Sequence, residues 1–314
     1  MRINSIATAG LTALLLLLLA GCEGGAGRSY LSIGTGSTGG VYYPVGGALA
    51  SMLSADFPDR QFTAEVTAAS VENVTRMLQG EMDLGFAIST TIINAHNGGT
   101  PQFPEPMNEL RIIAPLWPNP LNVLVPANTE IESLRDLRGR RVSVGAPGSG
   151  TEEVSRMLFA AYDMSYDDID ERFLSFTESS SAIRDGSLAL AFLQVAYPAA
   201  AVLEATTTNQ ARLFPLEGPE IDALTTEFPH LYKTTIPAGV YRGIDEPIPT
   251  IAELNWVVGP ESLDPEIVTR ILDILQDERA RLIQVNDIVR QVDLQNLRSP
   301  PIPLHPATEA WMAE

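Results

Sequence analysis

The chain is short of cysteine, of lysine and of positive charge. Its 314 residues include one cysteine, Cys22, so no disulfide can form within the chain. Lys233 is the single lysine, and 20 basic residues stand against 39 acidic ones, which gives a net charge of −19. A nucleic-acid-binding protein needs a basic face, so this balance argues against that class. A small anionic ligand stays open, because helix dipoles and hydroxyl groups act locally.

The usual signatures of catalysis and metal binding are also missing. No nucleophile elbow occurs, and no pair of carboxylates stands out as an acid and a base. The three histidines, His96, His230 and His305, are far apart and show no metal-ligand spacing. We therefore expect no catalytic residue, no metal, no cofactor and no enzymatic activity.

Long apolar runs are limited to residues 11–19, which are too few to span a membrane comfortably. Arg2 gives a weakly basic start, and Leu-Ala-Gly-Cys at 19–22 resembles the lipobox of bacterial lipoproteins. That resemblance implies cleavage before Cys22 and lipidation of this cysteine; an ordinary signal peptide is the alternative. We expect a signal peptide over 1–21, a flexible tether over 22–29, and a folded part anchored to the membrane outside the cytoplasm, in the periplasm or its equivalent.

The rest of the chain predicts an α/β protein. Hydrophobic residues make up 45% of the sequence and charged residues 19%, as in a globular protein with a core. Apolar and β-branched runs alternate with helical segments, which is typical of a mostly parallel sheet buried on both faces. The first strands are expected at 30–34, 62–67, 84–88 and 110–116.

Two glycine-rich corners organise this pattern. Residues 31–43, LSIGTGSTGGVYY, predict a strand, a glycine turn and a helix over 41–54, and residues 142–151, VSVGAPGSGT, repeat this order 111 positions later, from Ile33 to Val144. Glycine allows a tight turn and a close approach to a ligand, and a helix start presents unpaired N–H groups. Each corner is therefore expected to attract an anion.

The segments after the corners repeat as well. Residues 72–86 and 179–192 both predict a helix, a glycine and a strand, with Gly80 and Gly186 106 positions apart. Two similar α/β units, each with an anion-binding corner, predict two lobes with a ligand held between them.

Candidate ligand-binding residues follow the strands of both units. Side chains at the carboxyl ends of parallel strands border the ligand crevice, which places Ser89 and Thr90 there in the first unit. Gln194 and Tyr197 take the corresponding place in the second unit. Tyr42, in the first turn of the first helix, either lines the cleft or packs against the sheet.

The second corner allows two interpretations of its serine. Ser149 and Glu152 match an S-x-x-E capping box, so Ser149 either caps its own helix or binds the ligand. Thr151 and the backbone N–H groups of Ser149 and Gly150 are available in both cases. Glu152 and Glu153 could receive an α-amino group, which favours an amino acid as ligand.

The first corner also matches the dinucleotide-binding pattern G-x-G-x-x-G at residues 34–39. A Rossmann site needs an acidic residue about 20 positions further on, at the end of the second strand. Glu65 comes 26 positions after Gly39 and lies inside the expected strand. No G-K-[ST] follows either corner, so a P-loop is excluded, and a dinucleotide enzyme is the weaker alternative.

The chain resembles the TAXI family of solute-binding proteins, which serve tripartite ATP-independent periplasmic (TRAP) transporters. The resemblance runs from about Leu31 to the C-terminus, and its carriers are residues 33–46 (IGTGSTGGVYYPVG), 136–152 (DLRGRRVSVGAPGSGTE), 236–241 (IPAGVY) and 303–306 (PLHP). It implies a type II periplasmic-binding-protein fold, with two α/β lobes, a central ligand cleft and crossing hinge strands. Matched to the family motifs, Ser37, Thr38, Gly39 and Tyr42 lie on one side of the ligand, and Gly148, Ser149, Gly150 and Thr151 on the other.

The resemblance also implies a function. A protein of this kind captures a small organic anion, such as glutamate or a dicarboxylate like 2-oxoglutarate, and delivers it to a sodium-coupled membrane permease. A ligand-binding lipoprotein of an ABC transporter or a membrane sensor is the alternative, because it would share the fold and the cleft. We expect a monomer that closes around its ligand.

The chain is expected to cross twice between the two lobes. Residues 30–118 with 242–314 are expected to form lobe 1, and 119–241 lobe 2. Two prolines at 118 and 120 are expected to interrupt the strand before 121–125 crosses between the lobes, and 234–241 to make the return crossing. Further elements are expected as strands at 173–176 and 188–193 and one helix from about 264 to 285.

Overall fold

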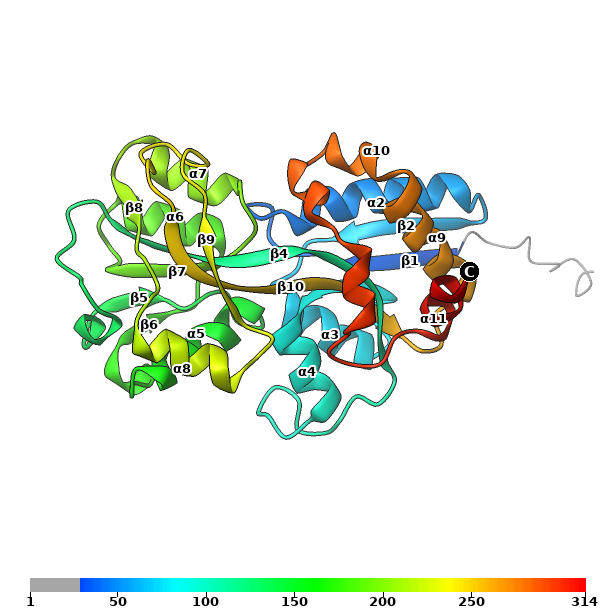
Figure 1. Ribbon diagram of the computed structural model, residues 1–314, viewed down its shortest axis with the longest axis horizontal. Helices are drawn as coiled ribbons and strands as arrows, with labels where there is room; N and C mark the ends of the chain where they lie inside the picture. The colour runs from blue at the N-terminus through cyan, green and yellow to red at the C-terminus, as the bar shows by residue number, and fades with distance from the viewer. Residues whose placement is uncertain (1–28) are drawn as a thin grey trace, which may run out of the picture.

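Two long strands, β4 (Leu110–Pro126) and β10 (Ile248–Pro260), run through the molecule and connect two α/β lobes (Figure 1). The computed structural model describes residues 29–314. The two strands are antiparallel neighbours, with Leu110 opposite Pro260 at one end and Pro120 opposite Ala252 at the other. They join the lobes into a ten-stranded sheet.

Lobe 1 begins with three parallel strands in the order β2-β1-β3, and β10 and β4 complete its part of the sheet. All five residues of β3 are buried, as expected for a strand covered on both faces. Its elements are β1 (Ser29–Gly34), α2 (Tyr42–Asp56), β2 (Arg60–Glu65), α3 (Ser70–Leu78), β3 (Leu84–Ile88), α4 (Ser89–Asn97), α9 (Pro265–Asp277), α10 (Arg279–Ile283) and α11 (Pro306–Ala313).

Lobe 2 repeats this plan with strands β6-β5-β7, followed by the second half of β4 and then β8. In each lobe the first three strands are parallel and the fourth is antiparallel to the third. Its elements are β5 (Arg141–Ser143), α5 (Gly150–Ala161), β6 (Asp170–Arg172), α6 (Phe176–Arg184), β7 (Leu190–Gln194), α7 (Ala200–Thr207), β8 (Ala211–Leu213), α8 (Pro219–Glu227) and β9 (Tyr232–Ile236). The internal repeat expected from the glycine corners is therefore present as a repeat of topology.

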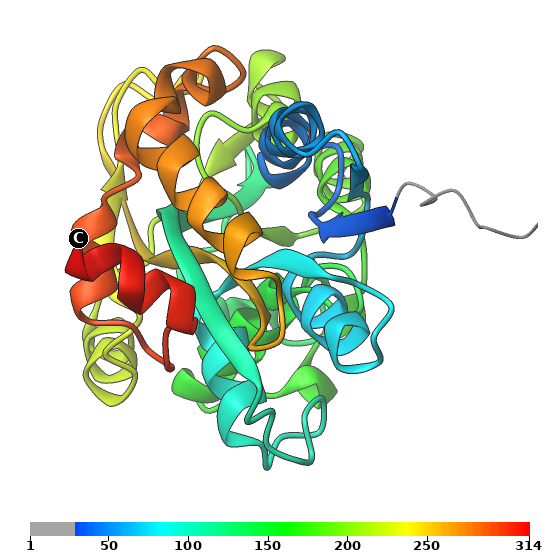
Figure 2. The same cartoon turned by 90° about the vertical axis from the view of Figure 1, so that its right-hand side faces the viewer.

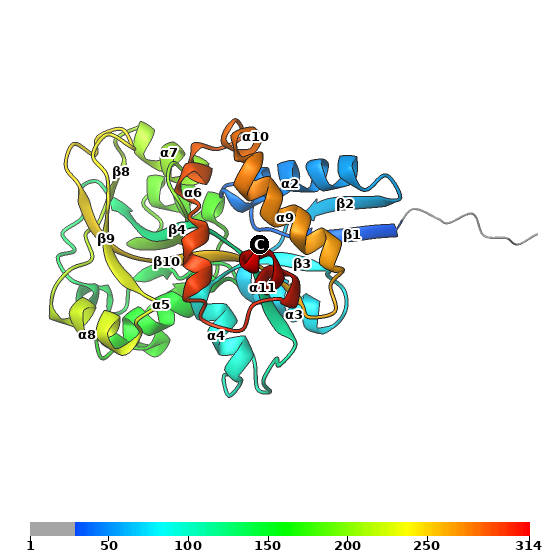
Figure 3. The same ribbon diagram turned by 45° about the vertical axis from the view of Figure 1, so that its right-hand side comes forward.

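Helices cover both faces of the sheet in each lobe. In lobe 1, α2 and α9 lie on one face, and α3 and α4 lie on the other (Figure 2). In lobe 2, α6 and α7 take the first face, and α5 and α8 the second (Figure 1). The C-terminal helix α11 packs against α9 at the outer side of lobe 1 (Figure 3).

The proline pair does not interrupt the strand that crosses between the lobes. Pro118 and Pro120 lie inside the 17-residue strand β4, opposite Leu254 and Ala252 of β10. A proline lacks only the N–H group, and the carbonyl of Pro120 still accepts a hydrogen bond from the Val195 N–H at 3.2 Å. The extended backbone that these prolines favour suits a strand, so the expected break is wrong.

The expected return crossing at 234–241 is also wrong. Residues 232–236 form β9, which pairs antiparallel with the first half of β10, from Ile236 opposite Ile248 to Tyr232 opposite Ala252. The chain returns to lobe 1 through β10 itself, which then pairs with β3. The predicted lobe boundaries at 118/119 and 241/242 stay a prediction.

Two further elements differ from expectation. The strand expected near 173–176 lies at Asp170–Arg172, as β6, because Ser175 already caps α6 through a capping box with Glu178. The predicted helix over 264–285 begins as expected, at its cap Asp264, but it divides into α9 and α10 at Glu278. The change of direction lets Leu282 pack in the core, where it is buried.

Candidate ligand-binding site

A cavity of about 250 Å³ lies between the lobes, beside the crossing strands. Lobe 1 supplies the first corner, the loop before α3 and the end of β3. Lobe 2 supplies the second corner, the start of α6 and the end of β7, and β4 supplies two residues from the crossing itself. The lining residues are Gly36, Ser37, Gly40, Val41, Tyr42, Val66, Thr67, Ala68, Ala69, Ser70, Ile88, Trp117, Asn119, Ala146, Ser149, Gly150, Thr151, Ser175, Phe176, Gln194, Val195 and Ala196.

Four helices begin at this cavity. Residues at or next to the N-termini of α2 and α3 from lobe 1 and of α5 and α6 from lobe 2 are part of its wall. The first turn of a helix has N–H groups without intrahelical partners and carries the positive end of the helix dipole. Four such ends around one cavity favour an anionic group inside it.

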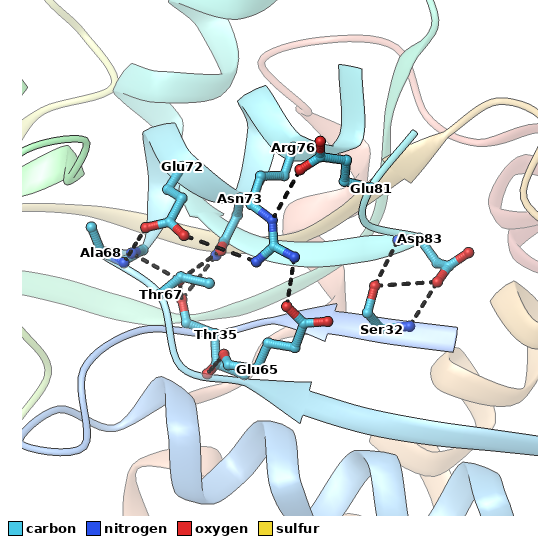
Figure 4. Close-up of polar contacts among 11 residues, drawn as sticks. Ser32, Thr35, Glu65, Thr67, Ala68, Glu72, Asn73, Arg76, Glu81 and Asp83 are labelled. Carbon is cyan, nitrogen blue, oxygen red and sulfur yellow. Dashed lines mark hydrogen bonds and ion pairs between the residues drawn. The ribbon is translucent and has the colours of Figure 1, made fainter. Parts of the chain in front are cut away.

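A buried asparagine holds the lobe 1 half of the wall in place (Figure 4). The side-chain amide of Asn73 donates to the carbonyls of Thr35 and Phe86, both at 2.8 Å, and its Oδ1 accepts from the Thr67 hydroxyl at 2.7 Å. These bonds tie the first corner, the end of β3 and the loop before α3 to one side chain. Gly34 makes room for it, since a Cβ there would lie 2.5 Å from Asn73 Oδ1.

The loop before α3 contains a strained backbone. Ala69, in the cavity wall, has φ of 86°, which is costly for a residue with a Cβ. The N–H of Ala69 donates to the Thr67 hydroxyl at 3.0 Å, and the N–H of Ala68 donates to the Glu72 carboxylate at 2.7 Å. Non-glycine residues in such conformations are often found at ligand sites, where the surrounding bonds hold them.

The lobes contact each other around the cavity. The N–H of Glu72 in α3 donates to the carbonyl of Gly148 at 2.9 Å, and the N–H of Ala201 in α7 donates to the carbonyl of Gly39 at 3.3 Å. Gly150 of lobe 2 comes so near lobe 1 that a Cβ would lie 2.4 Å from Ile88 Cδ1. The lobes are thus held against each other, in a closed arrangement.

Half of the sequence-predicted ligand residues line the cavity, namely Ser37, Tyr42, Ser149, Gly150, Thr151 and Gln194. Among residues 29–314, the hydroxyls of Ser37 and Thr151 have no hydrogen-bond partner, so both are free for a ligand. Ser149 caps α5, accepting from the Glu152 N–H at 3.2 Å and donating to the Ala146 carbonyl at 2.7 Å. The hydroxyl of Ser149 is therefore already engaged.

The other predicted residues lie outside the cavity lining. Thr38 is exposed, and Gly39 and Gly148 make the lobe contacts described above. Tyr197 is half-buried and packs against the large core cluster. Which of the predicted residues line the cavity depends on the tertiary structure and not on their position in the sequence pattern.

Ser89 and Thr90 do not line the cavity, because both form hydrogen bonds with the crossing strand β10. Ser89 Oγ donates to the Leu254 carbonyl at 3.2 Å and accepts from the Trp256 ring N–H at 2.9 Å. The N–H of Thr90 donates to the Glu253 carboxylate at 2.6 Å. The N-terminus of α4 is therefore already occupied by a carboxyl group of the protein itself.

Glu152 and Glu153 are engaged by side chains of the protein. Glu152 pairs with Arg156 along α5, and Glu153 accepts hydrogen bonds from Thr91 and Asn94 of α4 across the lobes. Neither carboxylate lines the cavity. The expectation that they favour an amino acid is therefore not supported by their geometry.

Two buried carboxylates near the site have shifted pKa values. Burial raises the pKa of Glu253 to about 7, against the opposing hydrogen bonds from Thr90 and from Gln194 Nε2 at 2.7 Å. Burial also raises the pKa of Glu153 to about 7, and the Glu152 charge adds a smaller effect. Both groups belong to contacts between α4 and the rest of the molecule.

Sequence reasoning missed several lining residues. The loop 66–70, Trp117 and Asn119 of β4, and Ser175 and Phe176 of α6 are part of the wall. One signal was available for α6, because Ser175 and Glu178 form an S-x-x-E capping box. Nothing in the sequence indicated that the proline-flanked Asn119 lies at the cavity.

Comparison with solved structures finds the same two-lobed fold. One match is the alkanesulfonate-binding protein SsuA from Xanthomonas axonopodis pv. citri bound to MOPS, at 18% identity and a TM-score of 0.49, over 91% of this chain and 83% of that one. A protein of Bordetella bronchiseptica RB50 matches at 13% identity and a TM-score of 0.54, over 91% of this chain and 81% of that one. A binding protein of an ABC phosphonate transporter from Pseudomonas aeruginosa matches at 11% identity and a TM-score of 0.52, over 85% of this chain and 80% of that one.

At these identities the likeness concerns the fold alone. It confirms the expected periplasmic-binding-protein architecture of two α/β lobes. The family assignment comes from the sequence, because the model of the NMT1-like family matches residues 33–314. That range includes both glycine corners, both lobes and the crossing strands. The chain therefore belongs to the NMT1-like family.

Proposed function

We propose that the protein is an extracytoplasmic solute-binding protein that captures a small organic anion between its lobes and delivers it to a membrane transporter. The observation that carries the proposal is the interlobe cavity at which four helices begin. A ligand there touches both lobes and so stabilises the closed arrangement, which a membrane partner can distinguish from the open one. Catalysis has no place in this proposal.

The ligand is expected to bind without a charged side chain. The N–H groups of the helix ends and the hydroxyls of Ser37 and Thr151 supply the hydrogen bonds. Charge-assisted hydrogen bonds of this kind are stronger than neutral ones. The resemblance to the TAXI family names glutamate and 2-oxoglutarate as candidates, and both belong in a first screen.

Two classes of transporter are candidates for the membrane partner. The similar fold of a binding protein from an ABC phosphonate transporter favours an ABC system. The TAXI resemblance of residues 33–46 and 136–152 favours a TRAP permease. Uptake into vesicles that contain the neighbouring permease separates them: an ABC system needs ATP, and a TRAP system needs a sodium gradient.

Anchoring by a lipid on Cys22 is part of the proposal. Cys22 lies outside the described residues, so it rests on the lipobox resemblance alone. Within residues 29–314, every helix is too short or too polar to cross a bilayer. Replacing Cys22 by alanine should move the protein from the membrane fraction to the soluble fraction; retention in the membrane would contradict lipid anchoring.

Ligand binding at the cavity has a direct test. Small carboxylates are screened by thermal shift, and the affinity of each hit is measured by calorimetry. Thr151→Leu, in the cavity wall, should abolish binding of a hit, whereas Thr38→Leu, on an exposed residue of the other corner, should leave it intact. Equal affinities for the two variants would place the ligand elsewhere.

A further inference from the structure

We propose that the interlobe cavity selects organic monoanions with an apolar or aromatic body, over zwitterionic amino acids and over dicarboxylates. The inference rests on the proposed function, because it names the class of ligand for that same cavity. It differs from the glutamate or 2-oxoglutarate that the family resemblance implies.

The charge of the cavity wall disfavours a ligand with more than one charged group. No lining residue among those that the structure describes is an aspartate, glutamate, lysine, arginine or histidine. Glu253, which contacts the lining residue Gln194, is fully buried and engaged by Thr90 and Gln194, and the Glu72 carboxylate is engaged by the Ala68 N–H. An ammonium group in the cavity finds no carboxylate, and a second carboxylate finds no cation. Burial of an unpaired charge is costly, so ligands with a second charge are disfavoured.

One helix N-terminus at the cavity remains free for the anionic group of a ligand. The helices α5 and α6 are capped by the side chains of Ser149 and Ser175, and both have acidic residues in their first turn. Helix α3 has Glu72 in its first turn. Helix α2 has neither a side-chain cap nor an acidic residue in its first turn. The free N–H groups and the dipole of α2 can therefore stabilise a single anionic group of the ligand at its N-terminus.

Part of the cavity wall is apolar and aromatic. Tyr42, Trp117 and Phe176 line the cavity with Val41, Ile88 and Val195. The rings of Tyr42 and Trp117 are in contact, with centroids 6.4 Å apart and planes inclined at 59°. Burial of apolar ligand atoms against this surface contributes favourably to the free energy of binding, and an aromatic ring of the ligand can stack on it.

Two buried polar atoms support a ligand in this place. Trp117 Nε1 and Gln194 Oε1 are buried and have no partner within residues 29–314, and both residues line the cavity. Buried polar atoms of native proteins are nearly always hydrogen-bonded. A polar group of the ligand is the partner that the structure leaves open to them.

The selectivity is tested on the full-length protein by calorimetry with matched ligands. Alkyl and aryl monocarboxylates and monosulfonates, phenylacetate among them, are compared with phenylacetamide, phenylalanine, glutamate and 2-oxoglutarate. The tightest monoanion should bind at least about tenfold more strongly than any member of the second group. Equal or tighter binding of a zwitterion, a dicarboxylate or the neutral amide overturns the inference while leaving the proposed function in place. Binding of no compound in either group overturns both.

The position of the anionic group is tested at Gly40, directly before the N-cap of α2. A Cβ at Gly40 would meet no atom closer than the Ser37 carbonyl oxygen at 3.5 Å, so a small side chain fits. Gly40→Asp puts a carboxylate at the helix end, where it competes with the ligand, and Gly40→Asn is the uncharged control of equal shape. We expect the aspartate variant to bind the best monoanion at least about 30-fold more weakly than the asparagine variant.

Folding of both variants is checked by circular dichroism and thermal unfolding. Should the aspartate variant fail to fold, the pair Ser37→Asp and Ser37→Asn makes the same comparison at the neighbouring lining residue. Equal affinities within a folded pair overturn the assignment of the anion to α2.

Discussion

The two lobes have the same strand order but hold their site-forming loops by different means. Positions 106 residues apart correspond in the repeat, so Ala69 and Asn73 of lobe 1 match Ser175 and Ser179 of lobe 2. Ser175 caps its helix with ordinary backbone angles, whereas Ala69 precedes α3 with φ of 86° and no side-chain cap. Asn73 makes three buried hydrogen bonds, and Ser179 makes one, to Ser143 at 2.7 Å.

This difference shows that lobe 1 is the more specialised half. Lobe 2 satisfies its helix ends with its own serines and acidic residues, as a stable helix usually does. Lobe 1 leaves α2 without a cap and fixes the loop before α3 through a central side chain. An open helix end and a held loop are what an anion site needs, so we assign the anion to lobe 1 and the closing contacts to lobe 2.

The largest expected effect follows from Asn73. Asn73→Ala removes three hydrogen bonds and leaves the carbonyls of Thr35 and Phe86 without these partners, which should lower the free energy of unfolding by about 4 kcal/mol. Ser179→Ala, the matched change in lobe 2, should cost about 1 kcal/mol. Urea unfolding of both variants measures the difference. Similar losses would show that the lobes are held alike.

The next effect concerns Glu253, which joins α4 of lobe 1 to Gln194 of lobe 2. Burial raises its pKa from 4.5 to about 7, so its contribution to stability is fully present at low pH and is lost as the pH rises through 7. Glu253→Gln removes the charge and should make the protein more stable than wild type at pH 8 by about 3 kcal/mol. At pH 5 the two should differ by less than about 1 kcal/mol.

The control for this pH effect is Glu178, in the capping box of α6. Its hydrogen bonds to Ser175 lower its pKa, so its contribution is lost as the pH falls. Glu178→Gln should therefore change stability slightly and in the opposite sense, because the group is exposed. Denaturant unfolding from pH 5 to pH 8 measures both variants. Parallel pH profiles for wild type and Glu253→Gln would contradict a neutral buried Glu253.

A smaller effect is expected from Gly150, where lobe 2 approaches lobe 1. Gly150→Ala places a methyl group 2.4 Å from Ile88 Cδ1 in the closed arrangement, and overpacking of this kind costs about 2 kcal/mol. Opening of the lobes relieves the clash, so ligand affinity should fall about 30-fold with little change in the stability of the unliganded protein.

Gly47 in α2 supplies the matched control, because a Cβ there meets no atom within 4 Å. Gly47→Ala should keep full affinity and gain slightly in stability. Calorimetry with any ligand found in the screen measures the affinity of both variants. Wild-type affinity in Gly150→Ala would mean that the ligand does not need the closed arrangement.

The smallest effect tests the strain in lobe 1. Ala69→Gly removes the Cβ from a residue at positive φ and should raise the free energy of unfolding by about 1 kcal/mol. Ser175→Gly, at the corresponding position of lobe 2, should lower it by a few tenths of a kcal/mol, because the cap is lost. A destabilised Ala69→Gly would show that the loop is not strained.

Much of the fold followed from local pattern, and the errors lie where distant parts meet. Strand β3 and the cap of α9 at Asp264 were placed correctly, since apolar runs and caps act within a few residues. Local pattern predicts a break at Pro118 and Pro120. Whether a strand can continue through them depends on the neighbouring strands, which here pair without the missing N–H groups. Local pattern also predicts that Ser89 and Thr90 border the ligand. It cannot show that Glu253 engages α4, because Glu253 lies more than 160 residues away in the sequence.

The sequence by itself determined that two α/β units repeat and that each begins at a glycine corner with free N–H groups, because these properties depend on neighbouring residues. Only the tertiary structure decided which corner stays open to an anion and which closes against the other lobe. The N-termini of α2 and α5 both follow a glycine turn. The S-x-x-E pattern at α5 left the role of Ser149 open, and the structure shows that Ser149 caps α5 and that Gly150 lies against Ile88. The charge of the cavity was likewise decided in space, since Glu152 and Glu153 are turned to partners on helices and away from the ligand.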